Sequence, residues 1–243
     1  MAPLRAGRPL KRWRYLGVYR SDVMLCVGDA RVAGVPQRWW AVALPDGTLL
    51  EGSRGVELRP GRAVVRDVLD LELQEPEGVE VVSPHGRSYI WTSKHAPVRV
   101  RGRVSARGHT FELDGDDGFV DESAGYHARH TAWRWSAGVG RTEDGRRVAW
   151  NLVDGVHDAP SSSERTVWVD GDPHEVPPQE FAHDLSSVGD LRFREWSARE
   201  SHMNLLVMSN SYRQPFGEFS GELPCGLRLA EGHGVMEEHD VRW

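Results

Sequence analysis

The segment DESAGYHARHTAWRW, residues 121–135, places side chains that can move protons next to aromatic rings. Asp121 and Glu122 supply carboxylates, while His127 and His130 supply imidazoles. An imidazole titrates near neutral pH, and the pKa of a carboxylic acid can be shifted toward neutrality, so both groups suit general acid–base catalysis. We therefore name these four residues as candidate catalytic groups.

Aromatic and polar side chains that could hold a ligand accompany these acids and bases. The flat faces of tryptophan and tyrosine bind apolar groups and stabilise cations. The candidate ligand-binding residues are Tyr126, Arg129, Trp133, Trp135, Trp150, Asn151 and His157. A structural interpretation stays open beside this one, in which DESAGYHA is a polar loop, HTAWRW is a core strand, and residues 150–160 are a strand followed by a turn.

A second candidate acid–base pair lies in the C-terminal run HGVMEEHDVRW, residues 233–243. If this run is a strand, alternation places Glu237 and His239 on one face together with Val235. The pair would serve as acid and base if that face lines a cavity. On a solvated face it would be a charged pair of little energetic weight.

No motif for metal, nucleotide or nucleophile chemistry accompanies these residues. The chain lacks HExxH, paired CxxC, GxSxG, a GxGxxG that opens a helix, and a P-loop. His127 and His130 have the spacing of ligands on a helix, but their segment is typical of a loop that leads into a strand. We therefore expect neither a bound metal nor an organic cofactor.

The charge pattern bears on partners and location. The chain has 36 acidic residues and 30 basic ones, nearly all of the latter arginines that are scattered rather than striped, and its net charge is -6. Nucleic acid is therefore not an expected partner. No apolar run reaches membrane-spanning length and the first residues lack an apolar leader core, so we expect a cytoplasmic protein without a membrane partner. The oligomeric state is left open.

The two cysteines, Cys26 and Cys225, lie in strand-like runs near opposite ends of the chain. Their spacing does not match a metal site or a disulfide framework. We expect buried, reduced thiols, while a bridge between them stays open.

Antiparallel strands are the elements expected to position the candidate residues. Asp-Gly pairs, the strongest short-range hairpin signal, interrupt apolar runs at residues 44–50, 142–150 and 167–176. Between residues 147 and 154 the side chains alternate, with Trp150 on one face and Asn151 on the other.

Helix signals are weak because 26 glycines and 14 prolines interrupt nearly every long window. The best helix candidate is GRAVVRDVLDLELQEP, residues 61–76, although its LDLEL part alternates as a strand does. We predict an all-β antiparallel fold with little helix, closed into barrels or a two-sheet sandwich. Residues 1–85 and 86–243 are predicted to form two intimately packed β halves.

Four stretches carry a combined pattern: RWRYLGVYRSDVMLCVGDARVAGVPQRWWAV (12–42), GFVDESAGYHARHTAWRWSAG (118–138), RVAWNLVDGVHDAPSSSERTVWVDG (147–171), and QPFGEFSGEL with HGVMEEHDVRW (214–243). This combination resembles an actinobacterial family of proteins known as domain of unknown function 2804. The chain matches the family pattern at Arg129, Thr131, Trp133, Trp135, Asn151, Gly155, Asp158, Glu164, Trp168, Glu237, His239 and Trp243. It departs from the pattern at Glu122, where a tryptophan is expected.

That family is similar, more distantly, to the lipocalin-like (calycin) superfamily, which includes carotenoid 1,2-hydratase, tocopherol cyclase and bacterial pericyclases. The resemblance implies a lipocalin-like double β-barrel or half-barrel sandwich around an apolar cavity. It also implies cofactor-free chemistry, in which an acid protonates an alkene before water addition or ring closure, or in which the cavity templates a cyclisation.

Two functions from different classes fit these observations. The first is a cofactor-independent hydratase- or cyclase-type lyase or isomerase of natural-product biosynthesis, acting by acid–base catalysis on an apolar terpenoid, polyene or polyketide-like molecule. Asp121 or His130 would donate the proton, with Glu237 and His239 as the second choice. The alternative is a non-catalytic lipocalin-like carrier of an apolar metabolite. A structural role ranks third, in which the 10 tryptophans only fill a β-core.

Overall fold

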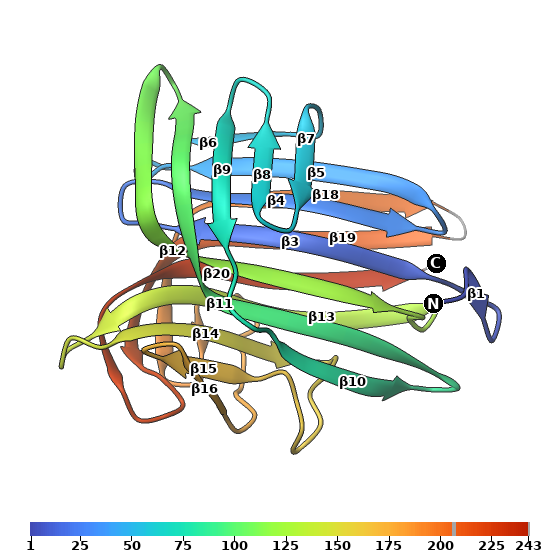
Figure 1. Cartoon of the computed structure of the whole chain (residues 1–243). Helices are drawn as coiled ribbons and strands as arrows, with labels where there is room; N and C mark the ends of the chain where they lie inside the picture. Colours follow the sequence, from blue (N-terminus) through green and yellow to red (C-terminus); the bar gives the residue numbers. More distant parts are fainter. Residues whose placement is uncertain (206–207, 243) are drawn as a thin grey trace.

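The computed structural model describes residues 1–205 and 208–242, and these residues form antiparallel sheets without a helix (Figure 1). The larger sheet has ten strands: β3 (Lys11–Tyr19), β4 (Met24–Val32), β5 (Val35–Ala43), β6 (Leu49–Gly52), β7 (Val56–Arg59), β8 (Arg62–Val65), β9 (Leu69–Gln74), β10 (Val79–His85), β11 (Ser88–Ala106) and β12 (His109–Gly125). Their order is β6-β5-β4-β3-β12-β11-β9-β8-β7, and β10 also pairs with β11.

The smaller sheet has eight strands: β13 (His130–Thr142), β14 (Arg147–Asp154), β15 (Thr166–Val169), β16 (Asp172–Glu175), β17 (Ser187–Val188), β18 (Leu191–Leu205), β19 (Met208–Glu222) and β20 (Arg228–Arg242). Their order is β16-β15-β14-β13-β20-β19-β18-β17. A separate hairpin joins β1 (Leu4–Arg5) to β2 (Arg8–Pro9). The predicted all-β antiparallel class is confirmed, and in the described part of the chain no helix could cross a membrane.

The three Asp-Gly pairs form hairpin turns, as predicted. Gly47 lies between β5 and β6, Gly145 between β13 and β14, and Gly171 between β15 and β16. Each has a positive φ, between 85° and 99°, a conformation that glycine adopts without a steric penalty. The turn chemistry therefore sets where these strands reverse.

The predicted helix candidate, residues 61–76, is a strand pair instead. It contains β8 and β9, and in β9 buried Leu69, Leu71 and Leu73 alternate with exposed residues. The period of two in LDLEL was therefore the correct signal, because it lets one face of the strand enter a core while the other meets water.

Three apolar clusters show how the sheets are curved. The larger sheet curls so that β7 lies against β4 around a first cluster, which includes Leu71 and Val100. A second cluster joins the facing sides of the two sheets, with Phe119 from the larger and Phe216 from the smaller. A third cluster, around Phe219, fills the inside of the smaller sheet. Each sheet thus encloses its own core, and the two pack face to face.

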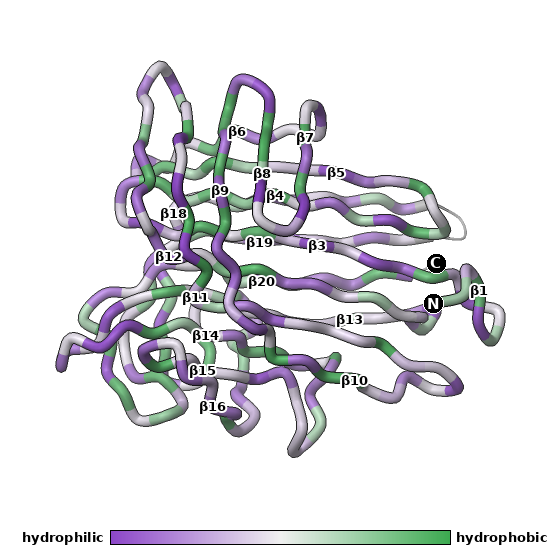
Figure 2. Tube along the Cα trace, in the orientation of Figure 1, coloured by the Kyte–Doolittle hydropathy of each residue, from purple (hydrophilic) through white to green (hydrophobic). Residues whose placement is uncertain are grey.

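Strand alternation distributes side chains between these clusters, and Figure 2 shows hydrophobic and hydrophilic residues interchanging along many strands. In β14, Trp150 and Leu152 enter the third cluster, whereas Ala149 and Val153 enter the second. The predicted face assignment of β14 is therefore confirmed.

The chain passes from one sheet to the other between Gly125 and His130. This crossover lies later in the chain than the predicted boundary after residue 85. The division into residues 1–85 and 86–243 stays a prediction.

Both cysteines are free thiols. Cys26 is buried in β4, as expected, but Cys225 is exposed. The expectation of burial was wrong for Cys225 because its run contains the hairpin turn between β19 and β20, closed by the Gly226 N–H to Leu223 O bond.

Candidate functional site

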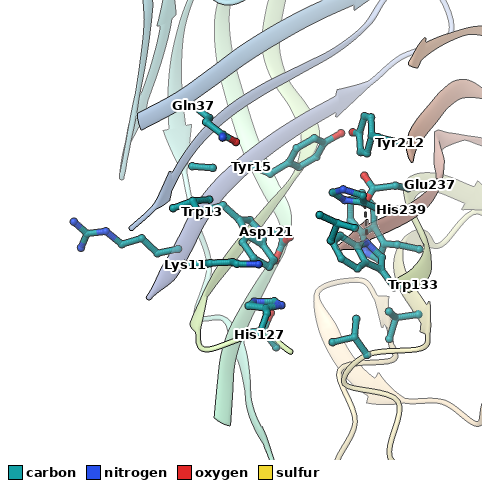
Figure 3. Close-up of a pocket in the computed structure, with 18 of the residues that line it drawn as sticks. Lys11, Trp13, Tyr15, Gln37, Asp121, His127, Trp133, Tyr212, Glu237 and His239 are labelled. Atoms are coloured by element: carbon teal, nitrogen blue, oxygen red, sulfur yellow. Dashed lines mark hydrogen bonds between the residues drawn. The ribbon is translucent and has the colours of Figure 1, made fainter. Parts of the chain in front are cut away.

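A cavity of about 370 Å³ lies between the two sheets (Figure 3). Its walls come from β3, β4, β5, β11 and β12 of the larger sheet and from β13, β14, β18, β19 and β20 of the smaller one. The volume is in the range of small-molecule sites. The aromatic part of the lining is Trp13, Tyr15, Trp39, Trp133, Trp135 and Tyr212.

The strand register aligns one row of cavity residues across the larger sheet. Asp121 of β12 lies opposite Tyr15 of β3 and opposite Lys94 of β11. Residues directly opposite each other in an antiparallel pair project from the same face. The three side chains therefore reach into the cavity together, although they come from distant parts of the sequence.

A matching row crosses the smaller sheet. His239 of β20 lies opposite Trp133 of β13 and Tyr212 of β19. Two residues earlier on the same face, Glu237 lies opposite Trp135. Figure 3 shows this row facing Tyr15 and Asp121 across the cavity.

A buried charge cluster surrounds Lys94. Its Nζ lies 2.5 Å from Asp121 Oδ1 and 3.4 Å from Glu164 Oε1. Trp13 Nε1 donates a further hydrogen bond to Asp121 Oδ2 over 3.0 Å. Burial alone lowers the pKa of Lys94, but the two carboxylates outweigh it and raise that pKa overall. Removing one partner from such a buried cluster costs about 3–5 kcal/mol, so the three side chains depend on one another for their stability.

Glu164 is the second carboxylate of this cluster. Its side chain is 2% exposed, and Oε2 accepts no hydrogen bond from the described residues. Burial raises the pKa of Glu164 to about 7, against the opposing effect of Lys94. Its pKa therefore lies close to neutral pH, as a group that gains and loses a proton during catalysis requires.

Glu237 is the carboxyl group best arranged to release a proton. Trp133 Nε1 and Gln214 Nε2 each donate to one of its oxygens over 2.9 Å. Burial raises the pKa of Glu237 to about 7, although these hydrogen bonds lower it. No cation forms an ion pair with Glu237 among the residues that the structure describes. A pKa this close to neutrality suits a general acid.

Three histidines line the cavity as neutral imidazoles. His127, between β12 and β13, is buried, and burial together with the nearby Lys11 lowers its pKa well below the usual value. Burial lowers the pKa of His157 to about 3 and that of His239 to about 4. His157 Nδ1 lies 2.8 Å from Ser83 Oγ, and His239 Nε2 lies 2.6 Å from Asn210 Oδ1. They offer hydrogen bonds rather than positive charge at neutral pH.

The structure brings together about half of the residues named from the sequence. The cavity is lined by Asp121, His127, Trp133, Trp135, His157, Glu237 and His239. Asn151 is fully buried behind it, where it accepts a hydrogen bond from Trp135 Nε1 and donates one to the backbone oxygen of Glu164. Asn151 therefore supports two lining residues without reaching the cavity.

Five other candidates lie away from the lining. Glu122 follows Asp121 in β12, so it points to the opposite face, where it pairs with Arg14 and His95. Trp150 occupies the core of the smaller sheet, on the far face of β14. Tyr126 is buried and donates a hydrogen bond to the backbone oxygen of Ala2. The remaining two, Arg129 and His130, are exposed, and His130 pairs with Asp240 at the surface.

Sequence reasoning missed Lys11, Lys94 and Glu164. The lysines are buried, at 5% and 4% exposure, and both line the cavity. One signal could have found them: they are the only two lysines in a chain whose other basic side chains are arginines. Glu164 matches the family pattern, but it lies in a loop whose path the sequence does not reveal.

The fold and site define a class: an antiparallel β-protein whose two curled sheets clasp a cavity lined by acids and aromatic rings. The model of the family described as "Domain of unknown function (DUF2804)" matches residues 52–243. The chain belongs to this family. A search of curated proteins found no match.

Solved structures share the fold over nearly the whole chain. An AttH-like protein from Nitrosomonas europaea has a TM-score of 0.50 at 12% identity, with 98% of each chain covered. CghA has a TM-score of 0.50 at 9% identity, covering 96% of this chain and 88% of its own. Kievitone hydratase from Nectria haematococca has a TM-score of 0.47 at 7% identity, and the match covers 96% of this chain and 88% of its own. At these identities the likeness to the AttH-like protein and to CghA shows the fold alone, and the predicted lipocalin-like fold is confirmed.

Proposed function

We propose that this protein is a cofactor-independent lyase or isomerase of the hydratase or cyclase type, which binds a largely apolar small molecule between its sheets and acts on it by proton transfer. The observation that carries this proposal is Glu237, a buried carboxyl group with a pKa of about 7 that faces the cavity between tryptophan rings. A cavity that served only to hold a ligand has no need of such an acid.

Glu237 replaces Asp121 and His130 as the preferred proton donor. Asp121 is bound by the Lys94 ammonium and the Trp13 indole, which are partners for a carboxylate rather than for a carboxylic acid. His130 lies at the surface. Two carboxyl groups in one cavity thus have different environments, the arrangement that separates an acid from a base.

The reaction balances without any other reagent. Glu237 gives its proton to an alkene carbon of the substrate, and the π electrons form the new C–H bond. Trp133 and Trp135 present ring faces that stabilise the carbocation. Water then adds to the cation and loses a proton to Asp121, or a second alkene closes a ring and a neighbouring C–H gives up its proton to Asp121, its electron pair forming a new double bond. Transfer through water from Asp121 to Glu237 restores the starting state.

The test is a timed incubation of the purified protein with an apolar extract of actinobacterial metabolites, read by mass spectrometry, with Glu237→Gln as the comparison. We expect a compound to disappear while an isomer or a water adduct grows. The variant should slow this conversion by about 100-fold or more, since general acid catalysis contributes that much.

The same incubation distinguishes the carrier function. A compound that is depleted by the protein but returns unchanged after denaturation would identify a binding protein and contradict the proposal. Conversion that continues at the wild-type rate in Glu237→Gln would contradict the assignment of the acid. Gln214→Leu is a useful second variant, because it removes a donor to Glu237 while leaving the carboxyl group in place.

A further inference from the structure

The cavity opens toward one end of the molecule. Most of its lining is buried or half-buried, and its exposed members are Arg12, Gln37 and Ser201. Arg12 lies near the start of β3, Gln37 near the β4–β5 hairpin, and Ser201 near the end of β18. Figure 1 shows β1 and the N-terminus at the same end. We call this region the mouth end.

Three segments that are distant in the sequence rim the mouth end. The Leu10 N–H donates to Pro3 O, and Leu10 O accepts from the Ala33 N–H, so the β1–β2 hairpin is tied to the β4–β5 hairpin. Arg199 of β18 lies over the ring of Trp39 in β5, 5.8 Å from its centroid. The end of β18 therefore extends beside the β4–β5 hairpin, as Figure 1 shows.

Exposed large apolar side chains gather on these segments. In the described part of the chain the exposed ones are Met1, Leu4, Val35, Val82 and Met203. Met1 and Leu4 belong to the N-terminal segment, Val35 to the β4–β5 hairpin, and Met203 to the end of β18. Leu4 and Val35 are 62% and 61% exposed. A single exposed apolar side chain is ordinary, but several around one opening mark an interaction site.

Exposed arginines surround the same opening. Arg12 and Arg31 lie directly opposite each other in β3 and β4, where like charges repel. Because side chains alternate along a strand, these two arginines project to the side of the larger sheet opposite Trp13. The exposed arginines of the mouth end that form no ion pair with another described residue are Arg5, Arg12, Arg31, Arg87, Arg129 and Arg242.

Acids on the neighbouring strand ends do not balance these arginines, because they already have basic partners. The pairs are Asp29–Arg38, Glu200–Arg213, Glu238–Arg134 and Asp240–His130. Asp154 and Asp158 lie at and beyond the end of β14, which β13 and β20 separate from β19. The whole chain has a net charge of -6, so the excess of positive charge is local to the mouth end.

Two further basic side chains lie behind the rim. Lys11 is buried, and Arg199 pairs with Glu51. The surface charge of the mouth end therefore comes from its arginines.

We propose that the mouth end docks on an anionic lipid bilayer, with its apolar side chains entering the headgroup region, and that the cavity takes its apolar ligand from that bilayer. Basic side chains bind an anionic lipid surface electrostatically, and apolar side chains strengthen the contact. The sequence led us to expect no membrane partner because no apolar run reaches spanning length, but a peripheral contact needs no such run. A carrier would use this contact as well as an enzyme would.

A second copy of the chain is a poorer match for this surface. A two-fold contact brings the same patch of both copies together. The arginines without ion pairs would then face one another, whereas an anionic bilayer supplies the opposite charge.

Vesicle flotation tests the contact. The probes are vesicles of phosphatidylcholine and vesicles of equal parts phosphatidylcholine and phosphatidylglycerol. We expect the partition coefficient to be about tenfold higher or more on the anionic vesicles, and to fall as salt screens the exposed charges. Equal partitioning, or no binding to either kind of vesicle, would overturn the proposal.

A pair of double variants locates the charge. Arg12→Gln with Arg31→Gln should lower the partition coefficient on anionic vesicles by about tenfold or more, since each arginine near such a surface contributes about fivefold. Arg66→Gln with Arg103→Gln is the control, because it removes the same charge from exposed arginines toward the β11–β12 hairpin, away from the mouth end. Equal losses would assign the binding to net charge and contradict the proposal.

Substitutions of the apolar side chains test their entry into the bilayer. Val35→Ser and Met203→Ser should each lower the partition coefficient by about threefold, also at high salt. Val82→Ser is the matched control, since Val82 is 62% exposed on β10, which β11 and β12 separate from β3. All three positions are exposed, so these variants should fold as the wild type does. A larger loss in Val82→Ser than in the other two would contradict the proposed orientation.

Sedimentation of the chain without vesicles tests the other occupant. Self-association that Val35→Ser abolishes, together with no vesicle binding, would identify a second copy and overturn the proposal.

Failure of this inference and failure of the proposed function give different results. If the protein is not an enzyme, vesicle binding persists while no substrate is converted. If the inference is wrong, substrate supplied in solution is converted while vesicles are not bound.

Discussion

At the scale of single residues, the cavity contains several ionisable side chains that are buried away from water. The clearest is Glu237, whose pKa burial raises from 4.5 to about 7. The folded state thus holds this proton more tightly than the unfolded state does. Its contribution to stability is fully present below about pH 4.5 and is lost as pH rises through about 7.

This linkage makes a prediction for Glu237→Gln. The free energy of unfolding of wild type minus that of the variant should decrease as pH rises from about 4.5 to about 8, by up to about 3 kcal/mol. Urea unfolding of both proteins at several pH values measures this difference directly. A difference that is constant with pH would mean that Glu237 does not hold its proton in the folded protein.

Individual site residues were predictable only where local pattern sufficed. Residues two apart on one strand share a face, which applies to Glu237 with His239 and to Trp133 with Trp135. Lys94 was missed because its partners Asp121 and Glu164 come from a neighbouring strand and a distant loop. Such contacts depend on strand pairing, which a single sequence does not specify.

At the scale of elements, alternation decides which neighbouring residues share an environment. Asp121 and Glu122 are adjacent carboxylates in β12, yet one enters the cavity and the other pairs with Arg14 behind the sheet. Composition grouped them as one catalytic cluster, whereas the period of a strand separates them. The interpretation of DESAGYHA as a polar loop was incomplete, because its first five residues belong to β12, which extends through Gly125.

The pair provides a matched test of this separation. Asp121→Asn should lower turnover by about 100-fold or more, because it removes the base beside Lys94. Glu122→Gln should leave turnover unchanged and cost about 1 kcal/mol of stability through its partly exposed ion pair. Initial rates and thermal unfolding of the two variants compare these outcomes. Equal losses of turnover would show that the opposite faces of β12 are not functionally distinct.

At the scale of the whole molecule, function depends on the sheets staying in contact, since the second apolar cluster and the cavity lie in the same interface. The all-β class was predictable from turns and alternation. The point where the chain changes sheets was not, because the connection after Gly125 resembles other loops and the pairing of β13 with β20 spans most of the C-terminal half.

The two cysteines report on this interface. Cys26 belongs to the second cluster, and burial raises the pKa of its thiol to about 11, while Cys225 is exposed. In the native protein a thiol reagent should modify Cys225 within the mixing time and Cys26 only after the sheets separate. Mass spectrometry after timed labelling measures both rates, and Cys225→Ser isolates the slow one. Rapid labelling of Cys26 would show that the interface opens easily.

Because the chain contains only two lysines, its reactivity toward amine-directed reagents is concentrated at two positions. Both side-chain amines lie in the cavity, at 5% and 4% exposure, and arginine supplies the basic side chains elsewhere. Amine-directed acylating reagents therefore have no side-chain target on the outside of the folded protein. A reagent small enough to enter would attach its tag to the interior, and a bound ligand would block it. Apart from the exposed amino terminus, labelling of side-chain amines is thus confined to the cavity without introducing a single mutation.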